Sequence, residues 1–352
     1  MGARTIVTIN GSTNQDGIIS IRVKRSINAP AQLTLAVNSV RGSRAFEIKR
    51  GDTIKIQASP HIHSIIPTIF YGFVTEVDQS NNRMIVNALD TLGRLGQEYI
   101  TTNPLAVADD VAGVISEIIS GSSYSLSIDR IIGHTGIRLP DNMNFIGKTR
   151  LAAVQMLLQI LDNSPNSFMI SADETGILMR KIFDPFTTGT GYPTALVGGR
   201  FPATGSSYDF RPTFVDRIEG DLDFFNTVTV SNSSKDIRVT EPATAVSQPV
   251  QIFVEESSVT DTSQARLWAR QYLNGRGSRK VQWQVECMPN NFYVIPGDVA
   301  VFYEVEGGLA GRQMVFDVLL DIDADSSLLS LTIGQPAPDL VSTLRLAAGV
   351  SV

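Results

Sequence analysis

The chain has 352 residues, 43% of them hydrophobic, which suits two or three folded domains and excludes wholesale disorder. Its 29 Lys and Arg against 35 Asp and Glu give a formal charge of −6, and no long basic block occurs, which argues against a dedicated nucleic-acid surface. Because Cys287 is the only cysteine, an intrachain disulfide and a cysteine-based zinc site are excluded.

The N-terminus passes directly into β-like alternation, so we expect no secretory signal. No apolar run approaches the ~20 residues that a transmembrane helix needs. We therefore expect a protein made in a reducing compartment, with no membrane insertion by this chain.

Residues 1–90 show the alternation of half-buried strands. Ile19, Ile21 and Val23 share one face of their segment, and polar residues occupy the other. Further alternating segments follow at 31–40, 68–78 and 83–90. Five or more short strands at close spacing predict a β-barrel or a β-sandwich.

The pattern changes after residue 90. Apolar residues spaced as on one face of a helix predict two helices, with stripes that consist of Val111, Val114, Ile115 and Ile118, and of Leu151, Val154, Leu157, Leu158 and Leu161. A hairpin that turns near residues 173–176 follows, and a stretch rich in Gly, Pro, Thr and Ser at 184–212 suggests a long loop. We predict an inserted α+β domain and loop over residues 91–212.

Strand patterns resume in residues 213–335, which we predict to form a second β domain. A helix is predicted at 261–274, where Asp261 can cap the first turn and Gln264 stands at the capping-box position. Residues 336–352 form a C-terminal tail that is either a docking peptide or an end cap.

An internal repeat links the two β regions. Arg50-Gly51-Asp52 and Pro296-Gly297-Asp298 each precede an alternating strand. Residues 73–78 and 316–321 each begin with Phe and end with Asp, and one more strand follows each of them. Glycine supplies a turn conformation that other residues resist, and Asp can accept hydrogen bonds from nearby amides. We infer a duplicated strand arrangement and align Phe73 with Phe316.

Three histidine and aspartate patterns suggest metals or catalysis, but each has a better structural interpretation. His61 and His63 lack an evident third ligand and are predicted to lie in a surface loop, and His134 stands alone. Asp321 begins a stretch that resembles a calcium loop, but Ser326 replaces the required Gly and Thr332 the required Glu. A solvated hairpin turn is predicted there instead.

Other candidates are equally weak. Glu255 and Glu256 are neighbours that point to opposite faces of a strand, and no apolar pocket is indicated that would raise the pKa of one of them. Cys287 lies in an alternating segment and is predicted to be a buried small hydrophobe. The glycines after Leu196 fit no phosphate-binding pattern. The sequence thus predicts no catalytic, cofactor-binding or metal site and no cofactor.

The order of these elements resembles the tail hub proteins of tailed bacteriophages, with counterparts in siphophage tail tips and type VI secretion spikes. The resemblance covers residues 1–335 and is carried mainly by two runs, from Phe70 to Leu92 and from Gly297 onward. It implies a mainly β fold with an α+β insertion and two tube-like antiparallel β-barrel domains related by internal pseudo-symmetry. These would be residues 1–90 and 213–335.

The resemblance also implies a function. Such a chain would be a structural virion protein at the distal end of the tail, made in the host cytoplasm and without enzymatic activity. As a homotrimer it would join the sixfold tail tube to a threefold spike or fibre, and it would form part of the DNA channel. Expected partners are the tail tube or distal tail protein, the spike or fibre and the tape-measure protein, and DNA would pass without specific binding.

Two alternatives stay open at this stage. One is a tail-associated cell-wall hydrolase, which would need a cleft with an acid–base pair. The other is a host-binding adhesin that presents Arg50-Gly51-Asp52 on an exposed loop. The second copy of the turn keeps Gly-Asp but has Pro296 in place of Arg50, which favours a structural role for the pair.

Overall fold

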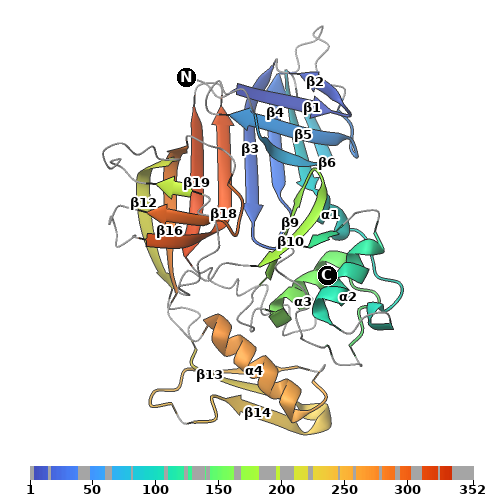
Figure 1. Cartoon of the computed structure of the whole chain (residues 1–352), viewed down its shortest axis with the longest axis vertical. Coiled ribbons are helices and arrows are strands. Elements are labelled where there is room, and N and C mark those ends of the chain that lie inside the picture. The colour runs from blue at the N-terminus through green and yellow to red at the C-terminus, as the bar shows by residue number, and fades with distance from the viewer. Residues whose placement is uncertain are drawn as a thin grey trace.

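The computed structural model shows a pair of curled β structures, a helical insert beside them and a smaller α/β layer below (Figure 1). The residues that the structure describes are 4–14, 17–38, 48–59, 66–80, 82–106, 110–122, 126–128, 139, 143–161, 168–181, 196–198, 210–220, 225–244, 246–256, 259–276, 280–289, 294–302, 311–323 and 326–334.

A 13-stranded sheet forms most of the molecule, and its ladders are antiparallel except at β11. Its strands are β1 (Arg4–Ile9), β2 (Ser12–Asn14), β3 (Ile18–Ser26), β4 (Gln32–Asn38), β5 (Thr53–Ser59), β6 (Thr68–Ser80), β7 (Arg83–Asp90), β11 (Leu196–Gly198), β12 (Phe210–Gly220), β16 (Lys280–Pro289), β17 (Val299–Phe302), β18 (Gly311–Asp323) and β19 (Ser327–Gly334).

The same strand order occurs twice in this sheet. The first half runs β3-β4-β7-β6-β5 and the second runs β12-β16-β19-β18-β17. In the second half β11 joins β17 to β12 and closes a ring of strands, whereas in the first half β1 and β2 extend the sheet beyond β5. The predicted mainly β fold with two related barrel-like halves is confirmed.

One apolar core fills both halves. Val7, Ile21 and Val86 from the first half and Val285 and Leu331 from the second are completely buried members of one cluster. Alternation along each strand sends one set of side chains inward, and burying each large aliphatic side chain contributes about 1.5–3 kcal/mol. Trp283 packs partly buried against this cluster.

The helical insert has its own core. Its elements are α1 (Thr91–Leu95), η1 (Pro104–Ala106), α2 (Val111–Ser120), β8 (Leu126–Ile128), α3 (Arg150–Leu161), β9 (Phe168–Asp173) and β10 (Gly176–Lys181). The predicted stripes of α2 and α3 are buried where their side chains are described. The Arg150 guanidinium donates to the carbonyls of Ile118 and Gly121 and so ties α3 to the last turn of α2.

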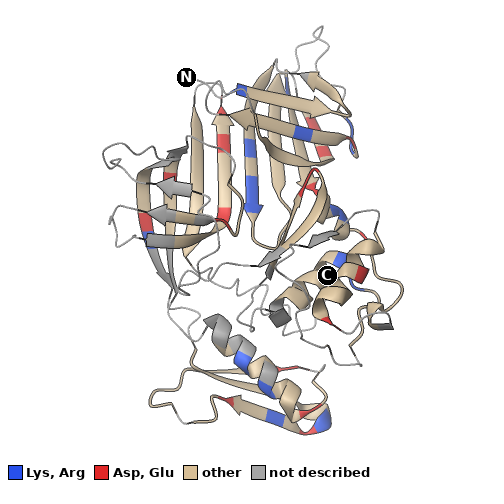
Figure 2. Ribbon diagram, viewed as in Figure 1, with Lys and Arg blue, Asp and Glu red and all other residues tan. Residues whose placement is uncertain are grey.

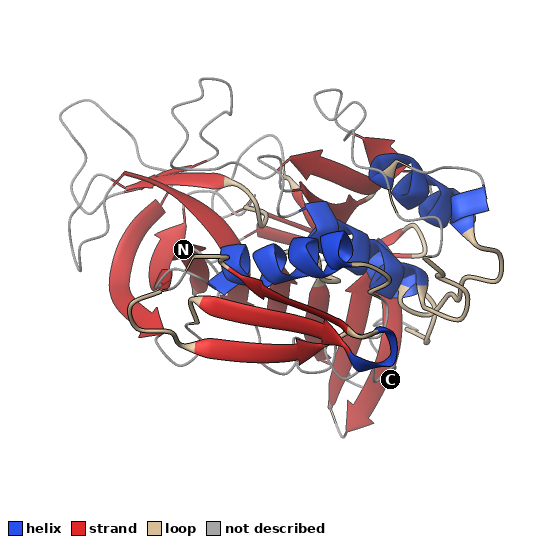
Figure 3. Ribbon diagram, turned by 90° about the horizontal axis from the view of Figure 1, so that it is seen from below, coloured by secondary structure: helices blue, strands red, loops and turns tan. Residues whose placement is uncertain are grey.

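A third layer lies below the others in Figure 1, and Figure 3 views the molecule from that side. It consists of β13 (Thr227–Asn232), η2 (Ser233–Lys235), β14 (Ile237–Glu241), β15 (Gln251–Glu255) and α4 (Thr262–Arg276). The predicted cap is present, because Asp261 accepts from the Gln264 amide at 2.9 Å. Glu241, which is buried, pairs with Arg266 of α4 at 3.2 Å and with Arg270 at 3.7 Å.

The assignment of this layer to the second barrel was wrong. The three strands form a separate sheet in the order β14-β13-β15, inserted between β12 and β16. Val228, Val230 and Val254 face Ala265 and Ala269 of α4 in a core of their own. Helix α4 covers the apolar face of this sheet. The apolar side chains of its strands are therefore buried against the helix and not against the barrel.

Candidate functional site

The first Gly-Asp turn connects into the edge of β6 through backbone hydrogen bonds. The Gly51 amide donates to the Val74 carbonyl at 2.8 Å, and the Val74 amide donates to the Asp52 carbonyl at 2.9 Å. The Asp52 carboxylate accepts from the Lys49 amide at 2.7 Å and from the Asn10 side-chain amide at 2.9 Å. Gly51 has φ +92°, a conformation that residues with a Cβ rarely adopt.

The second Gly-Asp turn repeats this geometry on β18. The Gly297 amide donates to the Val315 carbonyl at 2.7 Å, and the Val315 amide donates to the Asp298 carbonyl at 2.9 Å. The Asp298 carboxylate accepts from the Ile295 amide at 2.9 Å, and Gly297 has φ +87°. The predicted duplication of this turn is confirmed bond by bond.

The alignment of the strands that follow was shifted by two residues. The turn bonds make Val74 equivalent to Val315, and a register shift follows each of them at Thr75 and at Phe316. Phe73 therefore corresponds to Met314 and not to Phe316. The prediction relied on the Phe that begins each run. The loops that precede the two strands differ in length, so the position of this Phe relative to the turn does not fix the alignment.

The two halves meet at a strand pair that we call the seam. Residues 317–323 of β18 pair antiparallel with residues 20–26 of β3. The Arg22 guanidinium donates to both carboxylate oxygens of Asp321 at 2.6 and 3.1 Å, across a separation of 299 residues in the chain. Arg25 of β3 donates to the Val294 carbonyl at 2.6 Å, just before the second turn.

A polar ladder continues from the seam over the outward face of the sheet. Thr34 of β4 donates to Asn87 of β7 at 3.1 Å, and Asn87 donates to Glu76 of β6 at 3.2 Å. Together with Arg22 and Asp321 these residues cross five consecutive strands. The two halves therefore share one outward face as well as one core.

Acidic residues outnumber basic residues on this outward face. The charged residues at outward positions whose side chains are described are Glu76, Asp78, Asp216, Glu286, Asp317, Asp321 and Asp323, against Arg4, Arg22, Lys24, Lys55 and Arg83. Figure 2 shows the basic residues on β3 beside the acidic residues on β18. The described part of the face is thus polar and carries more acidic than basic residues, and Arg22 is paired with Asp321.

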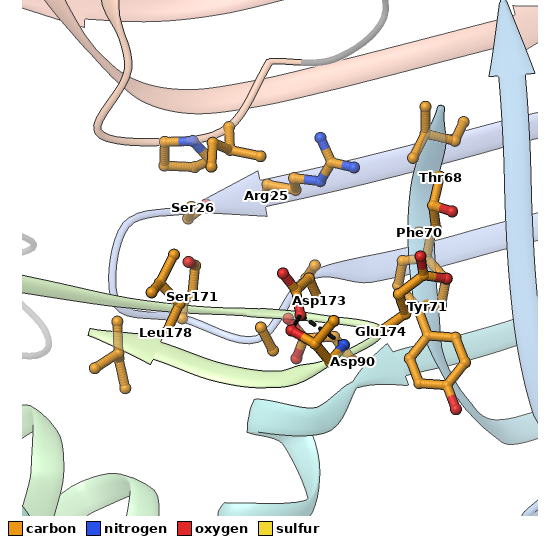
Figure 4. A pocket seen from close by; sticks show the side chains of 18 of the residues that line it. Arg25, Ser26, Thr68, Phe70, Tyr71, Asp90, Ser171, Asp173, Glu174 and Leu178 are labelled. Carbon is orange, nitrogen blue, oxygen red and sulfur yellow. Dashed lines mark hydrogen bonds between the residues drawn. The ribbon is translucent and has the colours of Figure 1, made fainter. Parts of the chain in front are cut away.

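A cavity of about 310 Å³ lies where three parts of the chain meet, and we call it the junction pocket. Its walls come from the ends of β3 and β6 in the first half, from the β9–β10 hairpin of the insert, and from Ile295-Pro296 at the second turn. Figure 4 shows Arg25 and Asp90 on opposite sides of it.

The polar groups around the junction pocket hold the three parts together. Asn28 of the β3–β4 turn accepts from the Ile170 amide at 2.9 Å and from the Gln155 side chain at 2.7 Å. Lys55 of β5 pairs with Glu174 at the tip of the hairpin. These contacts fix the insert against the first half.

Asp90 is the most perturbed carboxyl group at the junction pocket. It is 4% exposed and caps α1 by accepting from the Gly93 amide at 3.4 Å. Burial raises the pKa of Asp90 to about 7, although backbone hydrogen bonds and the charge of Arg25 act in the opposite direction. Its side chain stabilises the start of a helix, so its primary role is structural. The sequence signal for this cap was the Asp-Thr-Leu-Gly run that follows β7.

The described acidic candidates also have structural roles. Glu255 accepts from the Ser233 amide and from the Ser231 hydroxyl, both at 2.7 Å, and these bonds lower the pKa of Glu255. A general acid for glycoside hydrolysis needs the opposite shift. Asp321 lies in the predicted β18–β19 hairpin, where the Asp323 amide donates to the Ser326 carbonyl at 2.9 Å.

Cys287 is the buried small hydrophobe that its pattern predicts. It is inaccessible in β16, and its thiol donates to the Leu329 carbonyl at 3.2 Å. Burial raises the pKa of this thiol well above its ordinary range, which keeps it unreactive. His61, His63, His134, most of the loop at 184–212 and the tail at 336–352 lie outside the described residues.

None of the helices in the described part of the chain combines the length and the apolar character that a bilayer span requires. Within the same residues, no group of three or more His, Cys, Asp or Glu side chains is arranged to hold a metal ion.

No protein-family model and no curated protein sequence matches this chain. Solved structures do. The 43 kDa tail protein of prophage MuSo2 from Shewanella oneidensis has a TM-score of 0.64 at 12% identity over 94% of this chain and 97% of its own. The tail protein from Neisseria meningitidis MC58 has a TM-score of 0.65 at 11% identity, with 95% and 97% covered.

A secretion protein has a similar fold. The E. coli c3393 protein, a component of the type VI secretion system with structural similarity to T4 bacteriophage tail proteins, has a TM-score of 0.54 at 12% identity. The match covers 94% of this chain and 77% of that protein. This chain thus has a fold similar to those of phage tail proteins and of a component of the type VI secretion system.

Proposed function

We propose that this chain is a homotrimeric tail hub that joins a sixfold tail tube to a threefold spike or fibre. One observation carries the proposal, namely that a single chain contains the same strand order twice, joined edge to edge at the seam. Three copies would present six similar units to the tube and threefold symmetry to the spike. The likeness to phage tail structures supports this role.

The two halves, within residues 1–90 and 213–335, would form the wall of a DNA channel. The described part of their shared outward face is polar and carries more acidic than basic residues. Such a lining repels phosphates weakly and offers few cations for counterion release, so DNA would slide without specific binding.

The remaining parts would provide partner contacts. We assign the α+β insert within residues 91–181 and the tail at 336–352 to contacts with the tail tube or distal tail protein, the spike or fibre and the tape-measure protein. The protein would act at the distal end of the virion tail after synthesis in the host cytoplasm.

We propose no enzymatic activity. The described carboxylates of Asp90, Asp173 and Glu255 each accept hydrogen bonds from backbone amides of turns or caps. The adhesin alternative is also disfavoured, because the Asp52 carboxylate is engaged by Lys49 and Asn10 within the fold. Peptidoglycan turnover by the purified chain would contradict the proposed absence of enzymatic activity.

Light scattering over a range of concentrations, with negative-stain microscopy, tests the hub. The expected result is a trimer with a central opening and six-lobed or three-lobed end views. A strict monomer at high concentration would overturn the proposal. Retention on immobilised double-stranded DNA at low salt would contradict the passive channel lining.

A further inference from the structure

We propose that β6 of one copy pairs with β12 of the next copy, in the register that β18 and β3 use within a single chain. The inference rests on the proposed trimer and specifies its interface. Its partner is a second copy of this chain, and its template is the seam, which is an intramolecular example of the same joint.

The seam uses only part of β18. Residues 311–314 of this strand pair with β17, and beyond the bulge at Phe316 residues 317–323 pair with β3. The strand thus changes partners halfway along its length. Because β3 covers this part, Val318, Leu320 and Ile322 are buried.

The equivalent strand β6 has β5 as the counterpart of β17. In the described structure it has no counterpart of β3. Residues 68–73 pair with β5, and the turn contact from Asp52 to Val74 ends that ladder. Among the described residues no strand adds to this side of β6 beyond Val74. An exposed strand edge of this kind is a template for pairing with another chain.

The edge of β12 corresponds to the edge of β3 that pairs with β18 in the seam. A register shift lies at Thr213 in β12 and at Ile19 in β3, so the two strands correspond residue by residue, with Asp216 in the place of Arg22. Along its other side β12 pairs in the described structure with β11 alone, at Phe210. β12 and β6 lie on opposite flanks of the molecule (Figure 1), so they cannot pair within one chain.

Transferring the seam register fixes the contacts. In the seam Asp321 lies opposite Arg22. Ser80 takes the place of Asp321 on β6, so Ser80 is expected opposite Asp216 of the next copy. Phe214, two residues before Asp216 on the same strand, is 51% exposed although it is a large apolar residue.

Charges on the two edges are complementary in this register. Arg83 lies beside Ser80 within the β6–β7 hairpin, so it would face Asp216 of the next copy across the short serine side chain. Arg83 and Asp216 are both exposed. The joint between copies would thus keep an arginine–aspartate pair, as the seam does with Arg22 and Asp321.

The turns agree with this pairing. In the seam Arg25 lies beside the second turn and donates to the Val294 carbonyl. On β12 the corresponding backbone position carries Glu219, and the first turn begins with Lys49-Arg50. The register therefore brings the Glu219 position of one copy to the Lys49-Arg50 turn of the next.

Disulfide trapping tests the register. Ser80→Cys combined with Asp216→Cys should crosslink copies under mild oxidation, and the product should stop at a covalent trimer on a non-reducing gel. Ser80→Cys with Gly220→Cys is the control, because four residues of strand separate the two sites by about 13 Å and disulfides need Cα atoms within about 7 Å. Native Cys287 is buried and contributes no background.

A charge exchange tests the pairing without covalent trapping. Arg83→Glu alone and Asp216→Arg alone should each raise the concentration at which the trimer half-dissociates by about tenfold or more, because like charges would meet. The double variant should recover most of that loss. Circular dichroism and the melting temperature report whether each single variant keeps its fold.

The possible results separate this interface from the trimer itself. A strictly monomeric wild type would overturn both. A trimer that crosslinks only in the control pair, or in neither pair, would overturn the β6–β12 joint and leave the hub standing. Crosslinked species that extend without limit beyond three copies would contradict a closed ring.

Discussion

The two halves of the large sheet have the same backbone arrangement but different surroundings. Their strand order, Gly-Asp turns and bulges agree, while the buried Leu320 of the second half corresponds to the exposed Gln79 of the first. The apolar residue occurs where β3 covers the strand within the chain. The duplication has thus kept hydrogen-bond geometry and changed side chains according to what lies next to each strand.

The largest expected effect concerns Asp90, where the first half ends and α1 begins. Burial raises its pKa to about 7, so the folded chain binds this proton more tightly than the unfolded chain. Its contribution to stability is fully present below about pH 4 and is lost as pH rises through about 7, for a total of up to about 4 kcal/mol. Asp90→Asn should remove this dependence and keep the cap, since Asn also caps helices.

Denaturant unfolding of both proteins from pH 4 to 8 measures this effect. The free energy of unfolding of the variant minus that of the wild type should grow across the range. Parallel curves for the two proteins would show that folding does not change the pKa of Asp90. The comparison between variants removes the contributions of all other carboxylates.

A glycine in β6 gives the next largest difference between the halves. A Cβ at Gly72 would lie 2.1 Å from the Leu89 carbonyl oxygen, so Gly72→Ala must displace the backbone of β7. We expect a loss of about 3 kcal/mol or more. The equivalent position in β18 is Gln313, where the strand already accommodates a side chain, so Gln313→Ala should cost less than Gly72→Ala.

Chemical denaturation of these two variants tests whether Gly72 and Gln313 occupy equivalent positions with different steric surroundings. Equal losses at Gly72 and Gln313 would contradict the residue correspondence derived from the turns. The melting temperatures should rank in the same order as the free energies of unfolding.

The two turn aspartates provide a smaller contrast. Asp298 accepts from a partly buried amide, and Asp298→Ala would leave the Ile295 amide without this acceptor at a cost of about 1–3 kcal/mol. Water can reach the Lys49 amide, so Asp52→Ala should cost about 1 kcal/mol or less. Asparagine at either position keeps an acceptor and serves as the matched control; a larger loss at Asp52 than at Asp298 would reverse the ranking.

Local features of the sequence were predictable, and long-range pairings were not. Alternation and helical spacing gave β6, β7, α2 and α3, and cap chemistry gave Asp261. Alternation does not show which sheet a strand joins, so β13 to β15 were assigned to the wrong core. The seam was also out of reach, because Arg22 and Asp321 are 299 residues apart and no sequence pattern links one to the other.

The junction pocket was missed for a related reason. Asp90, Asn28 and Lys55 each look unremarkable in their own segments, and they matter only because three separate parts of the chain converge on them. The signal that existed was local, the cap run after β7. Phe73 and Phe316 show the opposite error, in which an identity in the sequence outweighed a bulge that only the structure reveals.

The smallest expected effect is at the seam itself. Arg22 and Asp321 form a two-pronged pair, but their side chains are 62% and 26% exposed, so solvent screens the attraction. Arg22→Ala should lower the free energy of unfolding by about 1 kcal/mol or less, and the difference should shrink in high salt. Lys24→Ala on the same face is the control. A loss of several kcal/mol would mean that the ion pair, and not the strand ladder with its buried Val318 and Leu320, holds the two halves together.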